Sequence, residues 1–201
     1  MRELDIKRVL VQELVRQGGV EALAHEYVFD FGRCRADVLC IKNGELHGYE
    51  IKSAFDKTSR LESQMRSYHL LFDYISVVCD KKHLDKVRLA VPVKTGLIIC
   101  DESGVRVKRS PKKNNKQNSL VMLDTIPAQR LRARFGKNAK SKFELCEKVR
   151  ESHSASYIRA ELLANLLEKF GRKTSLFISE TEGVVMLDDF YALELEDEQI
   201  I

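Results

Sequence analysis

An Asn-Gly pair at residues 43 and 44 separates two runs rich in apolar residues, 35–42 and 45–53. Asn-Gly is a strong signal for a two-residue hairpin loop between antiparallel strands. A loop of that length determines which residues face each other across the two strands, whereas a three-residue loop would break this correspondence. The pair therefore constrains the fold of this chain more than any other short stretch.

Counting back from the loop places Asp37 directly opposite Glu50, with Lys52 on the same face of the sheet. Opposed carboxylates have Cβ atoms roughly 4.5–5.5 Å apart and repel each other unless positive charge lies between them. The pattern therefore predicts a divalent cation held by Asp37 and Glu50, with the Lys52 ammonium beside it. Gly48 removes a side chain near the acids, which we expect to let a substrate approach closely. The alternative is a surface-exposed stripe of Glu50 and Lys52, with Asp37 at a strand end.

A cation next to a lysine can support hydrolysis of a phosphate ester. The cation lowers the pKa of its bound water, polarises a phosphoryl oxygen and stabilises the developing charge. Lys52 can orient that water, help to deprotonate it or neutralise the phosphate in the transition state.

Periodicity along the chain predicts an α/β fold in which one helix, three strands, a second helix and a further strand form the core, with helices following. The expected helices are 3–17, 56–73, 81–91, 126–135, 139–153 and 156–173, and the expected strands are 25–31, 35–42, 45–53, 74–80, 95–102 and 104–109. Residues 110–118 are polar and basic and are interpreted as a linker. The predicted domains are a core (1–109), this linker, and a helical C-terminal extension with an acidic tail (119–201).

Composition indicates a globular protein in the cytoplasm. Of the 201 residues, 44% are apolar and 32% are charged, which excludes a disordered chain. No run approaches the ~20 apolar residues of a membrane span, so no membrane partner is expected, and the first residues lack the apolar segment of a secretory signal. The five cysteines lack CxxC spacing, which is typical of free thiols in a reducing compartment.

The distribution of charge indicates a polyanion as partner. Residues 106–150 contain 14 basic and 3 acidic residues, whereas residues 174–201 contain 8 acids and no Lys or Arg. A basic middle is typical of nucleic-acid binding, and an acidic tail can compete for it. The alternative is two solvated faces that attract each other. The candidate phosphate-contacting residues are Arg33, Arg35, Lys108, Arg109, Lys112, Lys113, Lys116, Arg130, Arg132 and Arg134. No aromatic residues interleave with them, so we expect recognition of the backbone rather than stacking on bases.

Asp37 followed by Glu50-Ile51-Lys52 on the next strand resembles the active-site motif of the PD-(D/E)XK nuclease superfamily. The longer string from Arg35 through residue 78, "RADVLCIKNGELHGYEIKSAFD…RLESQMRSYHLLFDYISVV", is similar to a little-characterised bacterial and phage family within it. Gln64 and Tyr68 match the QxxxY element of RecB-like nucleases. The resemblance covers residues 3–100 and does not extend to the helical remainder.

The resemblance implies a restriction-endonuclease-like αβββαβ core with a mixed central sheet and a Mg²⁺ (or Mn²⁺) site. Asp37, Glu50 and the carbonyl of Ile51 would be metal ligands, and Lys52 the catalytic lysine. The remaining implied site residues are Gln64 and Tyr68, which would face the metal water or a phosphate, and Glu13, which would complete the metal site from the first helix. Glu13 lies within the apolar stripe of that helix, three residues from Leu10; Glu26 and Glu3 are the rivals.

Two positions depart from the family pattern. Ala36 replaces the proline of the motif, and Ala54 stands where an acid usually follows EIKS, a role that Asp56 can take instead.

These observations together predict a metal-dependent nuclease, with DNA as the expected substrate. The alternatives are a nuclease-fold protein that binds nucleic acid without cutting it, and a protein-interaction adaptor that uses the C-terminal helices. Endonuclease and exonuclease action, and RNA as substrate, are compatible with the same residues, and no oligomeric state is predicted.

Overall fold

A computed structural model describes residues 1–136, 138–181 and 184–194 of the chain. The strands are β1 (Val20–Phe29), β2 (Cys34–Lys42), β3 (Glu45–Lys52), β4 (Tyr74–Cys79), β5 (Gly96–Asp101) and β6 (Gly104–Arg109). The helices are α1 (Glu3–Gln17), α2 (Leu61–Leu71), α3 (Leu84–Ala90), α4 (Ser119–Asp124), α5 (Ala128–Phe135), α6 (Lys142–Ser152), α7 (Ala155–Glu180) and α8 (Asp189–Glu194). Short 3₁₀ turns precede α2 and α3.

The six strands form one mixed sheet in the order of the sequence. β1, β2 and β3 are antiparallel, β3, β4 and β5 are parallel, and β6 returns antiparallel to β5. The predicted hairpin register is confirmed, because Lys42 pairs with Glu45 and Leu39 pairs with Gly48. The fold is therefore α/β, with an αβββαβ core, a mixed central sheet and a helical extension, as expected.

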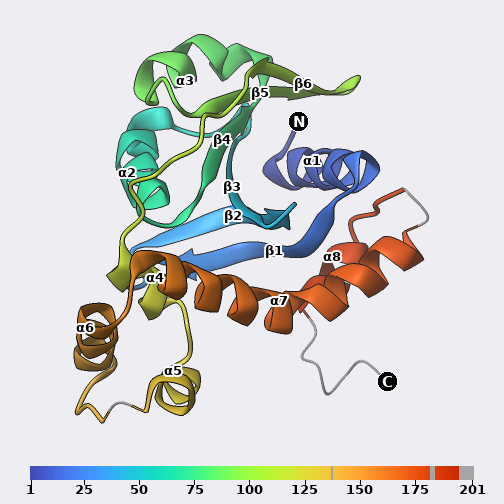
Figure 1. Ribbon diagram of the computed structural model, residues 1–201. Helices are drawn as coiled ribbons and strands as arrows, with labels where there is room; N and C mark the ends of the chain where they lie inside the picture. Colours follow the sequence, from blue (N-terminus) through green and yellow to red (C-terminus); the bar gives the residue numbers. More distant parts are fainter. Residues whose placement is uncertain (137, 182–183, 195–201) are drawn as a thin grey trace.

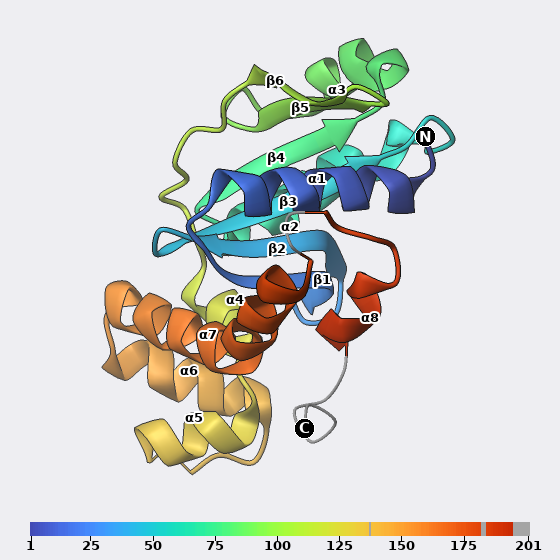
Figure 2. The same cartoon turned by 90° about the vertical axis from the view of Figure 1, so that its right-hand side faces the viewer.

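Helices cover both faces of the sheet (Figures 1 and 2). α1 packs against one face through Ile6, Leu10 and Leu14, which join a core with Val38 and Cys40 of β2. α2 packs against the opposite face through Met65 and Tyr68, which join a core with the odd-numbered residues Leu39 and Ile41 of the same strand. This alternation follows from the two-residue period of a strand.

Gly48 makes room for a helix rather than for a substrate. A Cβ atom built at this position would lie 2.7 Å from the ring of Phe72, which follows α2 and is fully buried. The expectation that Gly48 lets a substrate approach is therefore wrong. Its absent side chain allows the end of α2 to approach β3 closely.

The C-terminal helices continue the core of the sheet instead of forming a separate layer. α7 runs along the edge strand β1, where the Leu23 amide donates to the hydroxyl of Thr174 at 2.7 Å. Apolar residues of α4 to α7 belong to the same buried cluster as the α2 face of the sheet. α7 thus covers an edge strand that would otherwise present unpaired backbone groups.

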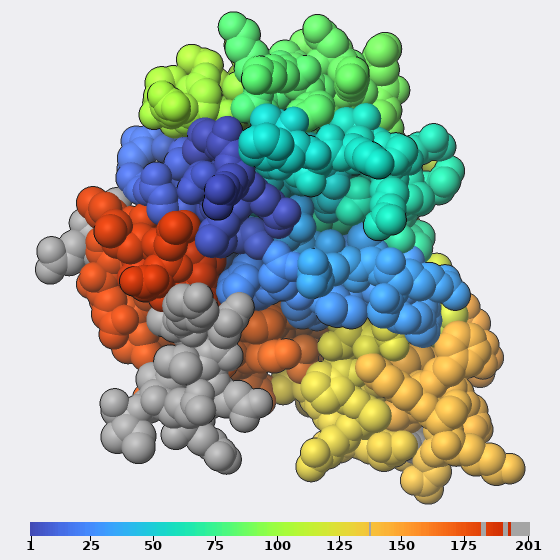
Figure 3. Space-filling model, turned by 180° about the vertical axis from the view of Figure 1, so that it is seen from behind, coloured from blue at the N-terminus to red at the C-terminus, as the bar shows by residue number. Residues whose placement is uncertain are grey.

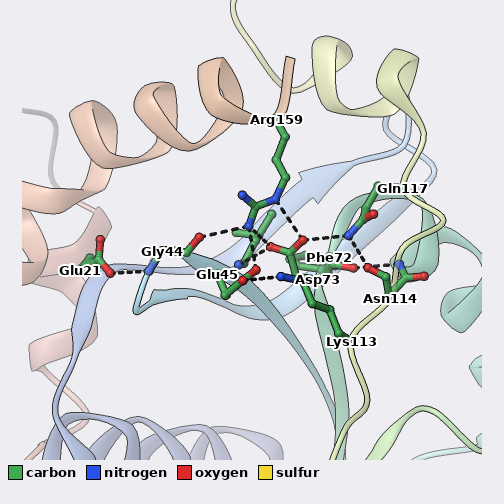
Figure 4. Close-up of polar contacts among 10 residues, drawn as sticks. Glu21, Gly44, Glu45, Phe72, Asp73, Lys113, Asn114, Gln117 and Arg159 are labelled. Carbon is green, nitrogen blue, oxygen red and sulfur yellow. Dashed lines mark hydrogen bonds and ion pairs between the residues drawn. The ribbon is translucent and has the colours of Figure 1, made fainter. Parts of the chain in front are cut away.

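A buried polar network joins this extension to the hairpin (Figure 4). Arg159 of α7 donates to both carboxylate oxygens of Asp73, at 3.1 and 2.6 Å, and to Glu45 at 2.8 Å. The Asn114 side-chain amide donates to the carbonyls of His69 and Phe72, at 2.8 and 2.9 Å. Residues 110–118 contain no helix or strand, as expected of a linker, but they are held against α2 by these contacts.

Several predicted elements have different limits in the structure. The first helix has the predicted bounds, whereas β1 begins five residues before the predicted strand 25–31 and α7 continues seven residues beyond the predicted helix 156–173. α4 and α8 were not expected. All five cysteines are buried and free. Among the described residues, no helix combines the length and apolar character required to cross a membrane.

Candidate active site

Three carboxylates from three adjacent strands lie near one another. The pairs His25–Val38 and Tyr27–Ala36 bracket Glu26 and place it opposite Asp37 across β1 and β2. Extending the β2–β3 register by one step from Val38 places Asp37 opposite Glu50, as the sequence predicts. Glu26, at one end of this row, pairs with Lys7 of α1, and Glu50, at the other end, accepts hydrogen bonds from Gln64 and Tyr68 of α2.

Glu50 is the centre of the polar contacts at this site. It is 1% exposed, and its Oε1 accepts a hydrogen bond from Lys52 Nζ at 2.6 Å and from Gln64 Nε2 at 2.5 Å. Its Oε2 accepts from the Tyr68 hydroxyl at 2.8 Å. The QxxxY spacing produces this arrangement because residues four apart lie on the same face of a helix. The structure therefore brings together Glu50, Lys52, Gln64 and Tyr68, four of the predicted site residues.

β2 and β3 separate at the point where Asp37 lies. In a continuing ladder the Ile51 amide would bond to the backbone of Ala36, but it donates to Asp37 Oδ2 instead, at 2.6 Å. The carbonyl of a ladder residue points to the same side of the strand as its amide, so the Ile51 carbonyl faces the same gap. Asp37, Glu50 and this carbonyl thus present hard oxygen atoms to one opening.

Asp37 carries the strongest perturbation of a carboxyl group at this site. Burial raises its pKa to about 8, and the negative charges of Glu50 and Glu3 raise it in the same direction. The Ile51 amide and Lys52 favour the ionised form and oppose this shift. Burial and the same carboxylates raise the pKa of Tyr68 well above its usual value, so its hydroxyl remains a hydrogen-bond donor. Carboxylates that destabilise one another in this way attract a cation.

A second acidic group overlaps the first. Carboxylate oxygens of Glu3, Glu26 and Asp37 lie within 4.8 Å of one another. Lys7, which is 4% exposed, forms an ion pair with Glu26, and Arg35 Nε lies 2.7 Å from the other Glu26 oxygen. Glu26 also has a φ of 53°, a conformation that is rare for a residue with a side chain. Strained backbone of this kind concentrates at functional sites.

Glu13 is not part of this acidic group. Its carboxylate accepts hydrogen bonds from Arg16 and Gln17 on the surface of α1. These hydrogen bonds, and the positive charge of Arg16, lower the pKa of Glu13. It is ten residues from Glu3, or roughly 15 Å along the helix. The geometry does not bring Glu13 to Asp37, whereas carboxylate oxygens of its rivals Glu3 and Glu26 lie within 4.8 Å of an Asp37 oxygen.

Asp56 also has a local role. Its carboxylate accepts a hydrogen bond from the Ser53 amide at 2.6 Å and stabilises the turn after β3. It does not replace the acid that the family pattern places after EIKS.

The oxygen atoms at the site fit a hard divalent cation. Asp37 uses one oxygen for the Ile51 amide, and Glu50 Oε2 accepts from Tyr68 alone, so acceptor capacity remains on both carboxylates. Gln64 Oε1 is buried and has no hydrogen-bond partner among the described residues. A buried acceptor without a donor is costly, and a water molecule bound to a cation between Asp37 and Glu50 would satisfy it.

Most of the predicted phosphate-contacting residues lie away from these carboxylates. Lys113 forms an ion pair with Glu45 at the start of β3, whereas Lys52 ends that strand, roughly 20 Å away by strand rise. Lys108, Lys112 and Lys116 are exposed on β6 and on the linker, on the Lys113 side of the molecule, and Arg132 is exposed on α5. Arg109 donates to the carbonyls of Thr95 and Pro92, Arg130 pairs with Glu168, and Arg134 pairs with Glu161. Arg33 and Arg35 alone lie at the end of the sheet where the acids gather.

An exposed aromatic side chain lies near the site and was not among the predicted site residues. Phe55, three residues after Lys52, is 81% exposed and stands between Lys52 and the exposed Lys57 and Arg60. On the other flank, the Arg33 guanidinium lies 5.9 Å from the centre of the Phe31 ring. In the sequence, the signal for this side chain was an apolar residue between basic residues in the turn after β3.

The elements that carry the site meet on one face of the molecule. Seen from behind, atoms of the first residues of α1 (dark blue), of the β1–β2 region (light blue) and of the segment after β3 (turquoise) lie side by side (Figure 3).

Comparison with known proteins gives three findings. A family model described as "Bacteriophage P4 protein cII" matches residues 1–194. The chain is 32% identical to Protein cII of Enterobacteria phage P4 over 112 residues, which are 54% of this chain and 42% of that relative, so the match spans less than half of the relative's length. Among solved structures, SPO1766, a protein of unknown function from Silicibacter pomeroyi, is 17% identical with a TM-score of 0.44, over 80% of this chain and 91% of the other.

Proposed function

The chain belongs to the bacteriophage P4 protein cII family, and we propose that it is a metal-dependent nuclease that hydrolyses phosphodiester bonds in DNA. The observation that carries this proposal is the convergence on Glu50 of Lys52, Gln64 and Tyr68 beside the opposed Asp37. A structural ion pair would need Lys52 alone. An additional carboxylate with a raised pKa and a buried amide oxygen without a donor are instead typical of a site that handles a cation and water.

The residues of the chain have distinct roles in the proposed reaction. Asp37, Glu50 and the Ile51 carbonyl would hold Mg²⁺ or Mn²⁺, which supplies an acidified water and polarises the phosphate. Lys52 orients the attacking water and offsets the charge that develops on the phosphate. Gln64 accepts a hydrogen bond from that water, and Tyr68 holds Glu50 in its rotamer.

The surface around the site suits a nucleic-acid strand. Arg33, Lys57 and Arg60 are exposed cations on the segments that flank the carboxylates, and they can contact phosphates. Phe55 is placed to stack on a base or a sugar. This surface replaces the linker as the expected substrate path, because the linker lysines lie at the far end of the sheet. Free buried cysteines suit a cytoplasmic location, which is part of the same proposal.

The test is a cleavage assay on supercoiled and linear DNA with Mg²⁺ or Mn²⁺. We expect cleavage by the wild-type protein and loss of at least a hundredfold in rate for Lys52→Ala, since removing one charge-stabilising donor typically costs about 10²–10³ in rate. Lys94→Ala is the matched control, because it removes an exposed lysine beside the linker, at the far end of the sheet, and should keep the cleavage step. Thermal melting checks that both variants fold. Equal rates for Lys52→Ala and wild type would refute the proposal.

A second candidate function has a specific observation in its favour. Glu50 already accepts three hydrogen bonds from protein donors, which would also suit a nuclease-fold protein that binds nucleic acid without cutting it. Such a protein would bind DNA with salt-dependent affinity unchanged by Lys52→Ala, and it would show no cleavage with either metal.

A further inference from the structure

Figure 2 shows α1 crossing one face of the sheet. A separate cavity of about 440 Å³ lies on that face. It extends between the C-terminal half of α1 and β6, and strands β3, β4 and β5 form its floor. Glu50 and Lys52 point to the opposite face, and they occupy the other end of β3. The proposed nuclease reaction therefore makes no use of this cavity.

Three aromatic rings stand on the cavity floor in nearly parallel planes. His47 of β3 pairs in register with Tyr74 of β4, and their ring centres are 4.9 Å apart at an interplanar angle of 17°. Tyr49, two residues along β3, has its ring 6.4 Å from His47 at 12°. Burial lowers the pKa of His47 to about 4, so its ring is neutral at physiological pH. His47 and Tyr74 cover the sides that face each other, so the uncovered faces of this row are available to a planar ligand.

Two hydroxyls that have no partner among the described residues line the same cavity. Tyr49 is 6% exposed and Ser76 is 4% exposed, yet neither hydroxyl has a hydrogen-bond partner within the part of the chain that the structure describes. Gly96 provides the space beside Ser76, since a Cβ at this position would lie 2.4 Å from the Ser76 hydroxyl. Neither oxygen is fully enclosed, so both hydroxyls can exchange solvent for hydrogen bonds to a molecule bound beside the rings.

The charged residues at the cavity mouth are already paired. The Glu13 carboxylate is held by Arg16 and Gln17, and Lys42 donates to Gln17 at 2.9 Å. Glu45 pairs with Arg159 and Lys113. Lys42 is the only cation among the described lining residues, so the mouth offers little to a phosphate and favours an uncharged ligand.

We infer that this cavity binds an uncharged planar heteroaromatic ring of the nucleobase class, stacked on the rings of Tyr49, His47 and Tyr74 and hydrogen-bonded at its edge by the Tyr49 and Ser76 hydroxyls. A nucleobase has both the flat face and the polar edge that this lining requires. The base can come from a free nucleoside or from a base splayed out of a nucleic-acid strand. A cavity of this size is within the usual range of small-molecule sites.

The test is titration of the full-length protein with adenosine, guanosine, cytidine and thymidine, followed by calorimetry and by NMR of the aromatic signals. We expect saturable binding of at least one nucleoside. Tyr49→Phe should weaken it at least fivefold by removing only a hydroxyl, and Tyr74→Leu at least tenfold by removing a ring. Tyr157→Phe on α7 is the matched control and should bind as wild type does.

Two further measurements define the source of the base and the independence of the site. Weaker binding of single-stranded oligonucleotides to Tyr74→Leu would identify a splayed base, whereas an effect on nucleosides alone would identify a free ligand. Lys52→Ala should keep nucleoside binding, so failure of the nuclease proposal would leave this one standing. The inference is overturned if no nucleoside binds saturably, or if Tyr49→Phe and Tyr74→Leu bind as tightly as wild type.

Discussion

Replacement of Arg159 by methionine tests how the helical extension is attached to the sheet. The guanidinium contacts both oxygens of Asp73, one oxygen of Glu45 and the Gly44 carbonyl at 3.1 Å (Figure 4). Asp73 is 2% exposed. Methionine keeps much of the apolar volume of the side chain and removes the charge, so Asp73 loses its cation while remaining buried.

The size of the effect follows from what Asp73 retains. Removal of one partner from a buried ion pair costs about 3–5 kcal/mol of unfolding free energy. Asp73 keeps the Leu46 amide and the Gln117 amide as donors, both at 2.8 Å, and the Arg159 side chain is 29% exposed. We therefore expect a loss of about 2–3 kcal/mol, at or just below the lower limit of that range. For a chain of this length the melting temperature should fall by roughly 4–12 °C.

The assay is urea unfolding monitored by circular dichroism, with thermal melting as a second measure. Arg66→Met is the matched control, since Arg66 pairs with Glu62 on the exposed surface of α2 and such pairs contribute about 0–1 kcal/mol. Hydrogen exchange in Arg159→Met should increase first in α4 to α7, because these helices lose their link to the hairpin. If Arg159→Met is as stable as Arg66→Met, the proposed anchoring role of Asp73 is incorrect.

Three further predictions follow from the site and the core. In metal-free protein the raised pKa of Asp37 gives stability that is complete below pH ~4 and is lost as the pH rises through about 8. Urea unfolding in chelator at pH 5, 7 and 9 should therefore show a steeper loss of unfolding free energy with pH for wild type than for Asp37→Asn. If the two proteins lose stability equally with pH, the pKa of Asp37 is not raised by its surroundings. Gly48→Ala should cost about 1–3 kcal/mol by overpacking against the ring that it faces, whereas Gly171→Ala on α7 should be neutral or stabilising; equal stabilities would show that the sheet adjusts freely. Glu3→Gln should weaken Mn²⁺ binding in calorimetry while Glu13→Gln leaves it unchanged, and the reverse order would restore Glu13 to the metal site.

The elements that depend on local sequence were predictable. The Asn43-Gly44 loop determines the hairpin register through turn geometry alone, and that register opposes Asp37 and Glu50. The QxxxY spacing places two side chains on one helix face, so their common orientation also follows from the sequence. The resemblance to a nuclease motif added the expectation that this face meets Glu50.

Contacts between distant segments decided the rest. Glu3 rather than Glu13 joins the acids because the N-terminal end of α1, not its middle, lies over the end of β2 where the strands separate. Glu26 enters the row because β1 pairs alongside β2, and its positive φ has no local sequence signal. Gly48 faces Phe72. The basic linker contacts the start of β3, whereas the acids lie at the other end of this strand. Local patterns specify which face a side chain occupies, but only the packing of helices on the sheet determines which faces meet, because those contacts join residues far apart in the chain.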